Sequence, residues 1–216
     1  MRTLALTALL LTGAAASTAS ADIVKVSIYG VVYGNGVTAP PLGGNGPGSA
    51  VTVTFELDSN NFVNSPNFPV RGYVVDQASF SMKVGNGTVG LQNPFPAGEV
   101  PYFVLRNNDP GVDGFYMSTD VDGPNGVPLN QNGIFGAFRN DFSVTYTANT
   151  LSSLSILGAV GNYDFTNLTN FNWIVADGPF DAIGIDFDHM VIEVVPAPST
   201  LLPFAAVGIF ARRRRN

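Results

Sequence analysis

The stretch Ala50-Val51-Thr52-Val53-Thr54-Phe55-Glu56-Leu57 alternates apolar and polar side chains without interruption. Successive side chains of an extended chain point to opposite faces, so this pattern places Val, Phe and Leu on one face and Thr and Glu on the other. Such a segment is typical of an antiparallel strand with one face in the core and one in solvent. The stretch therefore predicts a β-rich fold.

Two other segments, residues 77–84 and 141–148, alternate in the same way. Weaker strands are expected at residues 23–33, 70–76, 87–92, 102–107, 114–119, 134–138, 172–175 and 183–194. Gly85-Asn86-Gly87 predicts a hairpin, because Asn and Gly tolerate the positive φ of tight turns. Residues 35–48, 60–69 and 109–133 are rich in Gly, Pro and Asn and are expected to be loops.

These observations predict an all-β protein, an antiparallel β-sandwich of jelly-roll type formed by residues 22–195 as one domain. Only residues 151–157 leave room for a short helix. The chain of 216 residues contains no cysteine. The fold must then be stabilised by its core without disulfides, and thiol catalysis and thiolate metal sites are excluded.

An acidic, glycine-rich region offers a candidate calcium site. Asp109, Asp113, Asp120 and Asp122 lie within fourteen residues, interspersed with Gly and Asn. Calcium takes six to eight oxygen ligands, which Asp carboxylates and loop carbonyls supply. The spacing does not follow the helix-loop-helix calcium pattern, and Asp and Gly are also the commonest turn residues. The region is therefore either a set of structural turns or a calcium site.

Catalytic arrangements find little support in the sequence. His189 is the only histidine, and no Gly-x-Ser-x-Gly motif accompanies it. Asp186 and Asp188 are two residues apart and are expected to project from one face of a strand. Glu56 and Glu193 take outward positions on strands and form a conceivable pair for glycoside hydrolysis. We expect a protein without enzymatic activity, with a secreted hydrolase as one alternative.

Aromatic side chains suggest a second alternative, a carbohydrate-binding module. Sugars stack on exposed Tyr and Trp, and the chain has seven Tyr and one Trp, Trp173. The same residues also fill sandwich cores, and Tyr146 falls on an inward register.

The N-terminal residues 1–21 read as a secretory signal peptide. Arg2 supplies the positive start, residues 4–11 are apolar, and Ala19-Ser20-Ala21 has the small-x-small form that signal peptidase cuts. Cleavage is expected between Ala21 and Asp22.

The C-terminal residues combine three features in a fixed order. Val195, Pro196, Ala197, Pro198 and Ser199 form a proline motif, residues 201–211 are apolar, and Arg212, Arg213, Arg214 and Arg215 follow. An apolar segment bounded by arginines is expected to enter a membrane with its basic end on the cytoplasmic side.

This order resembles the PEP-CTERM sorting signal of bacterial exported proteins. The resemblance covers residues 196–216, with Ala197 where the usual motif has Glu. It implies recognition of the proline motif by a membrane-embedded exosortase, transient membrane anchoring, and release to the cell surface or extracellular matrix. The expected partners are signal peptidase, the exosortase and extracellular polysaccharide. No cofactor is expected unless the acidic region binds calcium.

Without both ends, the remaining chain carries five basic and sixteen acidic side chains, a formal net charge of −11. Nucleic-acid binding is therefore excluded, because phosphate contacts require Lys and Arg. The expected role is that of an exported structural or adhesive protein.

Overall fold

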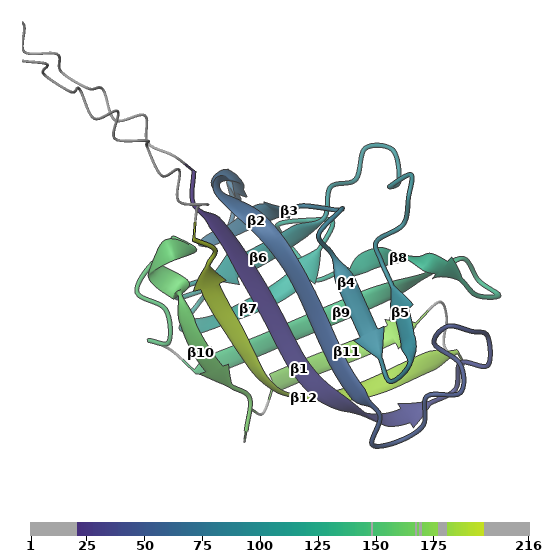
Figure 1. Ribbon diagram of the computed structural model, residues 1–216. Helices are drawn as coiled ribbons and strands as arrows, with labels where there is room; N and C mark the ends of the chain where they lie inside the picture. Colours follow the sequence, from purple (N-terminus) through teal and green to yellow (C-terminus); the bar gives the residue numbers. More distant parts are fainter. Residues whose placement is uncertain (1–20, 148, 167, 169, 177–180, 197–216) are drawn as a thin grey trace, which may run out of the picture.

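The computed structural model describes residues 21–147, 149–166, 168, 170–176 and 181–196. Within these residues all strands belong to one antiparallel sheet (Figure 1). The strands are β1 (Ile23–Asn35), β2 (Ala50–Asn64), β3 (Val70–Val75), β4 (Ser81–Val84), β5 (Gly87–Val89), β6 (Tyr102–Arg106), β7 (Val112–Ser118), β8 (Val127–Asn132), β9 (Ala137–Thr147), β10 (Gly161–Asp164), β11 (Asn170–Ala176) and β12 (Ala182–Val194). One 3₁₀ helix, η1 (Leu157–Ala159), is the only helical element of the described residues. The prediction of an all-β antiparallel protein is confirmed.

The path of hydrogen-bonded strands closes on itself. It runs β1-β12-β11-β9-β7-β6-β3-β2, and β2 also pairs with β1. Strands that follow one another along the chain are therefore neighbours in the sheet, apart from three short additions. The β4–β5 hairpin joins β2, β8 joins β9, and β10 joins β12. In Figure 1 the sheet is folded over, with β1, β2 and β12 in front of β6, β7 and β9.

The alternating stretch of β2 faces the core as its sequence predicts. Val51, Val53, Phe55 and Leu57 are at most 1% exposed, and the intervening side chains are half-exposed. β1 pairs with this segment from Ile23 to Val31, and it buries Val24, Val26 and Ile28 on the same side. The two strands therefore form one continuous apolar wall.

Aromatic rings fill the space between the two layers. Phe55 lies 5.3 Å from Phe103, and Phe103 lies 5.7 Å from Phe115, measured between ring centroids. Phe142 contacts Phe187 edge-on at 5.6 Å. Each buried Phe stabilises the fold by about 1.5–3 kcal/mol relative to an exposed one, so the core alone can hold a chain without disulfides.

Several boundaries differ from the sequence prediction. β8 and the start of β7 lie inside residues 109–133, which were expected to be a loop, and β10 was not expected. β2 extends to Asn64 into a second expected loop. Residues 77–79 form a turn in place of the expected strand, because Asp76 accepts hydrogen bonds from the backbone of Ala78 and Ser79.

The predicted hairpin at Gly85-Asn86-Gly87 is present. Val84 pairs with Gly87 to leave a two-residue turn, and Gly85 has φ of +55°. Asn45 braces the turn by accepting a hydrogen bond from the backbone N–H of Asn86 at 3.2 Å. Glycine is needed at residue 85 because a Cβ there would lie 2.4 Å from the Asn45 side-chain oxygen.

Among the described residues no helix is long and apolar enough to cross a membrane. The predicted signal peptide up to Ser20 and the apolar residues 201–211 lie outside the described residues.

Candidate functional site

The four predicted calcium ligands do not converge in the structure. Asp113 is fully buried, and its two carboxylate oxygens accept hydrogen bonds from the backbone N–H groups of Asn108 (2.8 Å) and Leu151 (2.7 Å). Asp109 lies in the adjoining turn, where its N–H donates to the carbonyl of Val112. Asp113 thus ties together two connecting segments.

Asp120 and Asp122 lie in a separate loop, residues 119–126, here called the cover loop. Asp120 accepts a hydrogen bond from the backbone N–H of Asp122 at 3.0 Å, the geometry of an Asx turn. Asp122 accepts one from the side-chain amide of Asn67 at 2.8 Å. Hydrogen bonds from Ser65 and Asn67 hold the pKa of Asp122 below its usual value.

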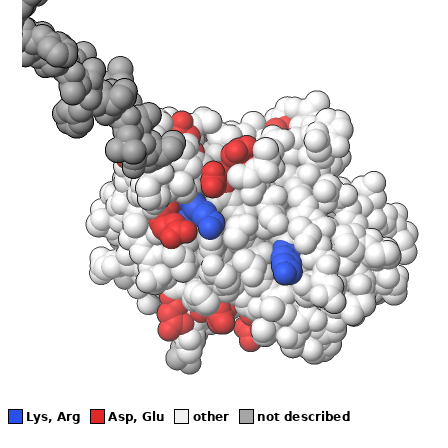
Figure 2. Space-filling model, in the orientation of Figure 1, with Lys and Arg blue, Asp and Glu red and all other residues white. Residues whose placement is uncertain are grey.

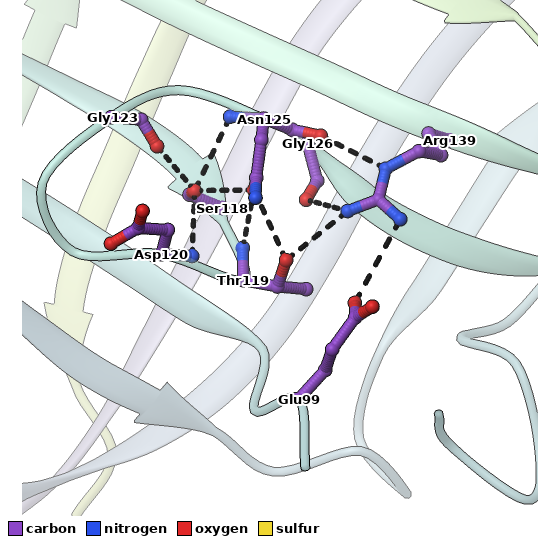
Figure 3. Close-up of polar contacts among 8 residues, drawn as sticks. All are labelled: Glu99, Ser118, Thr119, Asp120, Gly123, Asn125, Gly126 and Arg139. Atoms are coloured by element: carbon purple, nitrogen blue, oxygen red, sulfur yellow. Dashed lines mark hydrogen bonds and ion pairs between the residues drawn. The ribbon is translucent and has the colours of Figure 1, made fainter. Parts of the chain in front are cut away.

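Ser118 and Asn125 organise the cover loop (Figure 3). The hydroxyl of Ser118 lies 2.6 Å from the side-chain oxygen of Asn125 and accepts a hydrogen bond from the Asp120 N–H at 2.9 Å. The same Asn125 oxygen accepts from the N–H of Thr119 at 2.8 Å. The two ends of the loop are thereby joined directly.

Arg139 on β9 binds the other side of the cover loop. Its guanidinium donates to the carbonyls of Asn125 and Gly126, both at 2.9 Å, and to the hydroxyl of Thr119 at 3.2 Å. Glu99 forms an ion pair with the same guanidinium (Figure 3), and 3.8 Å separates its carboxylate oxygen from the Arg139 nitrogen. The Arg139 guanidinium is therefore engaged by protein oxygens.

The cover loop packs onto the outer face of β3, β6 and β7. Tyr116 donates its hydroxyl hydrogen to the carbonyl of Val121 at 2.6 Å. The space for Val121 exists because residue 72 is glycine, where a Cβ would lie 2.5 Å from the Val121 side chain. A second apolar cluster results, made of Val70, Tyr102, Val104 and Tyr116.

Within the described part of the chain, no three His, Asp or Glu side chains are close enough to hold a metal ion. The calcium hypothesis receives no support from the geometry of this region, where the carboxylates of Asp113, Asp120 and Asp122 accept hydrogen bonds from backbone or amide N–H groups. The alternative reading of these residues as structural turns fits every contact above.

His189 lies on the open face of the sheet formed by β1, β2 and β12. The register of β12 shifts beside it, because Tyr29 pairs with His189 while Gly30 pairs with Phe187. This bulge turns both Asp188 and His189 outward, and the imidazole contacts the Asp188 carboxylate. The ring of Tyr29 stacks on His189 at 4.6 Å.

Asp186 and Asp188 do project from one face, opposite the buried Phe187, as predicted. They line a shallow depression of about 380 Å³ together with Val31 and Thr166. Asp164 lies nearby on β10, and its pKa is lowered chiefly by the hydrogen bond from the Thr166 side chain. Among the described residues, the hydrogen-bond partner of the His189 side chain is Asp188 and not a serine.

Glu56 and Glu193 do not face each other across a cleft. Both pair with Lys25 in the ladders of β1, so Lys25 stands between them on the open face. Lys25 lies 3.7 Å from Glu193. Two strand spacings separate the glutamates by about 9.5 Å. The arrangement is a row of alternating charge (Figure 2 shows the face).

A depression that sequence reasoning missed lies where the β4–β5 hairpin approaches β8. It has a volume of about 380 Å³, and Phe80 and Leu91 contribute its apolar part. Four of its lining residues carry side-chain amides, namely Gln77, Gln92, Asn93 and Asn130. No sequence motif predicts this depression, because its amide residues come from three separate segments that only the fold brings together.

Most tyrosines contribute to packing. Tyr73 and Tyr116 are buried, and Tyr146 and Tyr163 pack against the main core, which agrees with the inward register expected for Tyr146. The side chain of Trp173 lies outside the described residues. The exposed face carries Tyr29 and Tyr33 on β1, and no longer row of aromatics is found among the described side chains.

The two ends of the described chain leave the sheet side by side. The backbone N–H of Val195 donates to the carbonyl of Ile23 at 2.8 Å, and Asp22 accepts one from Ser59 at 3.0 Å. Ala21, Asp22, Val195 and Pro196 are described, whereas Ala197, Pro198, Ser199 and Arg212 to Arg215 lie outside the described residues.

Comparison with models of protein families, with curated proteins and with solved structures finds no match to this chain.

Proposed function

We propose that this chain is an exported protein with a structural or adhesive role at the cell surface or in the extracellular matrix. It is delivered by a signal peptide, anchored briefly in the inner membrane by residues 201–215, and processed at Pro196–Ser199 by an exosortase-type protease. Its function requires no catalytic group of its own.

The pairing of the first strand with the last carries this proposal. Val24 pairs with Val194, so β1 and β12 close the circuit of strands within residues 23–194. Cleavage between Ala21 and Asp22, or after Pro196, removes none of the described strands. Both processing steps therefore leave the folded body intact, which a released protein requires.

We also propose that the fold is a β-sandwich, with β1, β2 and β12 in one layer and β6, β7 and β9 in the other. The buried aromatic contacts between Phe55, Phe103 and Phe115 support two facing layers. The strand order follows the chain order, so the long crossovers of a jelly roll are not part of this proposal.

A non-catalytic role is supported by the placement of the acidic and basic side chains. The row Glu193–Lys25–Glu56 is open to solvent, and the His189–Asp188 pair stands on the same open face. General acid–base catalysis needs groups held within reach of a bound substrate, usually in a concave site. The open face offers such groups in two open depressions, one beside Asp186 and one lined by Glu56, Asp58 and Asp76.

A second candidate function, carbohydrate binding, is favoured by the amide-lined depression. Neutral amides donate and accept hydrogen bonds together, as sugar hydroxyls require. Asn130→Ala with Gln77→Ala is expected to abolish retention on a polysaccharide column if this site binds glycans. Asn60→Ala with Asn61→Ala, in exposed positions of β2, is the control.

The main proposal is tested by replacing Pro196, Pro198 and Ser199 with alanine, beside the existing Ala197, in cells that produce an exosortase. The precursor is expected to stay in the inner membrane, while the unchanged chain is released. A control replaces Asn60 and Asn61, in exposed positions of β2, with alanine and leaves the motif intact. Release of the motif variant at the rate of the unchanged chain would contradict the proposal.

A further inference from the structure

Exposed apolar side chains gather at the end of the sheet where the chain leaves it. Six of them are between 37% and 45% exposed, namely Ile23, Phe62, Val63, Leu157, Val160 and Val194. They come from the start of β1, the end of β2, the end of β12 and the η1 region. Figure 1 shows these four parts together at the end where both grey traces begin.

Direct contacts link these parts into one surface, here called the terminal end. Phe62 packs on Tyr73 at 5.5 Å between ring centroids. The Tyr73 hydroxyl donates to the carbonyl of Leu154 and accepts from the N–H of Ile156, which brings the η1 segment against β3. The pairing of Val24 with Val194 places the end of β12 beside the start of β1.

The length of the following chain restricts what this surface can face. Six Cα–Cα steps separate Val195 from Leu201, where the apolar segment begins. Fully extended, they span at most about 20–22 Å. The headgroup layer takes about 5–8 Å of this length on each side of a bilayer. While residues 201–211 are in the membrane, the terminal end therefore lies within about 12–17 Å of the membrane surface.

The charged groups of the terminal end have both signs. The guanidinium of Arg71 lies 4.0 Å from the centre of the Phe62 ring and donates to the Asn64 side chain at 2.7 Å. On the other side of the surface, Glu56, Asp58 and Asp76 line a depression beside Ile23. A zwitterionic lipid headgroup offers a phosphate for Arg71 and a cationic amine for the carboxylates.

We propose that the terminal end is a membrane-docking surface, and that it rests on zwitterionic lipid headgroups while the precursor is anchored. Phe62, Val63, Leu157 and Val160 contact the headgroup boundary, and Arg71 binds lipid phosphate. Docking holds the Pro196–Ser199 segment close to the membrane, where a membrane-embedded protease can reach it. The inference rests on the anchoring that the proposed function includes.

The absence of cysteine makes a direct test possible, because each introduced thiol is unique. Val63→Cys and Val160→Cys place a fluorophore on the terminal end, and Ile134→Cys places one in the exposed β8–β9 turn. The exported chain from Asp22 to Asn216 is reconstituted in phosphatidylcholine vesicles that carry a quencher on the lipid headgroup. Circular dichroism before reconstitution verifies that each variant is folded.

Loss of emission is expected at residues 63 and 160, and unchanged emission at residue 134. Replacing Arg71 with Glu in the same labelled chains should restore part of the emission, because a carboxylate repels phosphate. Flotation with the vesicles reports the anchoring separately. Chains that float but show equal emission at all three positions overturn the docking surface alone. Chains that do not float overturn the anchoring, and the inference with it.

Discussion

The outer faces of the two layers differ in how they meet solvent. The outer face of β3, β6 and β7 is covered by the cover loop, and β7 is consequently buried on both sides from Asp113 to Ser118. The outer face of β1, β2 and β12 is open, and β2 alternates buried and half-exposed residues from Val51 to Ser59. The open face carries Thr, Lys and Glu, whereas the covered face carries Gly, Val and Tyr.

This difference shows that acidic composition does not by itself indicate a ligand site. The carboxylates near the covered face accept backbone or amide hydrogen bonds and shape its loops. On the open face the acidic side chains are solvated, paired with Lys25 or, in the case of Asp188, in contact with His189. Substitutions on the covered face should therefore lower the free energy of unfolding more than substitutions on the open face.

The largest effect is expected from Asp113→Ala. The change leaves the N–H groups of Asn108 and Leu151 without an acceptor in a buried place, at a cost of about 2–4 kcal/mol in the free energy of unfolding. Asp113→Asn keeps one acceptor oxygen and should cost about half as much. Urea unfolding of residues 22–196, which contain every described strand, measures both. A loss below that of an exposed substitution would contradict the structural role of Asp113.

A smaller effect is expected from Gly72→Ala, which breaks the contact between the sheet and the cover loop. The added Cβ would meet Val121 at 2.5 Å and the Tyr102 ring at 3.0 Å. The loop must shift, at a cost of about 1–3 kcal/mol. Gly34→Ala on β1 is the matched control, because a Cβ there meets nothing within 4 Å. Equal stability of the two variants would show that the loop is not packed on the sheet.

Tyr116→Phe is expected to cost about 1 kcal/mol at neutral pH, because it removes the hydrogen bond to the Val121 carbonyl. It should also change how the free energy of unfolding depends on pH in alkaline solution. Burial raises the pKa of Tyr116, Tyr146 and Tyr163, the last to about 12.

Unfolded tyrosine titrates near pH 10. Above about pH 10 the folded protein therefore holds phenol protons that the unfolded chain has released, and the free energy of unfolding falls as the pH rises toward about 12. Tyr116→Phe removes one such group and should make this fall less steep. Unfolding followed at several alkaline pH values measures the slope, and an unchanged slope would argue against a buried Tyr116 hydroxyl.

The smallest effect is expected on the open face. Lys25→Ala breaks the pair with Glu193, in which both side chains are about half exposed and 3.7 Å apart. Exposed pairs of this kind contribute about 0.2–1 kcal/mol and are weakened by salt. The difference in unfolding free energy should therefore disappear at high salt. A larger, salt-independent loss would mean that the open face is more closely packed than described.

The sequence predicted best those strands that have one face in solvent. The alternation of residues 50–57 and 141–148 identified the first half of β2 and most of β9, because each of these segments has one buried and one half-exposed face. β3, β6 and β7 show weaker alternation, since buried residues occupy both of their faces. The core lies against one face, and the cover loop packs on the other. β8 was missed because Pro128 and Asn130 read as turn residues, while its pairing with β9 depends on the fold.

The candidate sites could also be predicted from the sequence only in part. The outward orientation of Asp186 and Asp188 follows from their spacing. The bulge that turns His189 outward does not, because it depends on the pairing partner Tyr29. Lys25 stands between Glu56 and Glu193 only because residues far apart in sequence are neighbours in the sheet. The amide-lined depression likewise arises from distant segments.

The role of the cover loop can be tested most directly by thermal unfolding of residues 22–196 with calcium and with a chelator. A ligand that binds only the folded state raises stability by about 2.7 kcal/mol at a hundred times its Kd. We expect the same unfolding midpoint under both conditions, because Asp109, Asp113, Asp120 and Asp122 do not converge on one site among the described residues. A midpoint raised by calcium, and restored to the chelator value by Asp120→Asn with Asp122→Asn, would contradict this expectation and make the region a metal site.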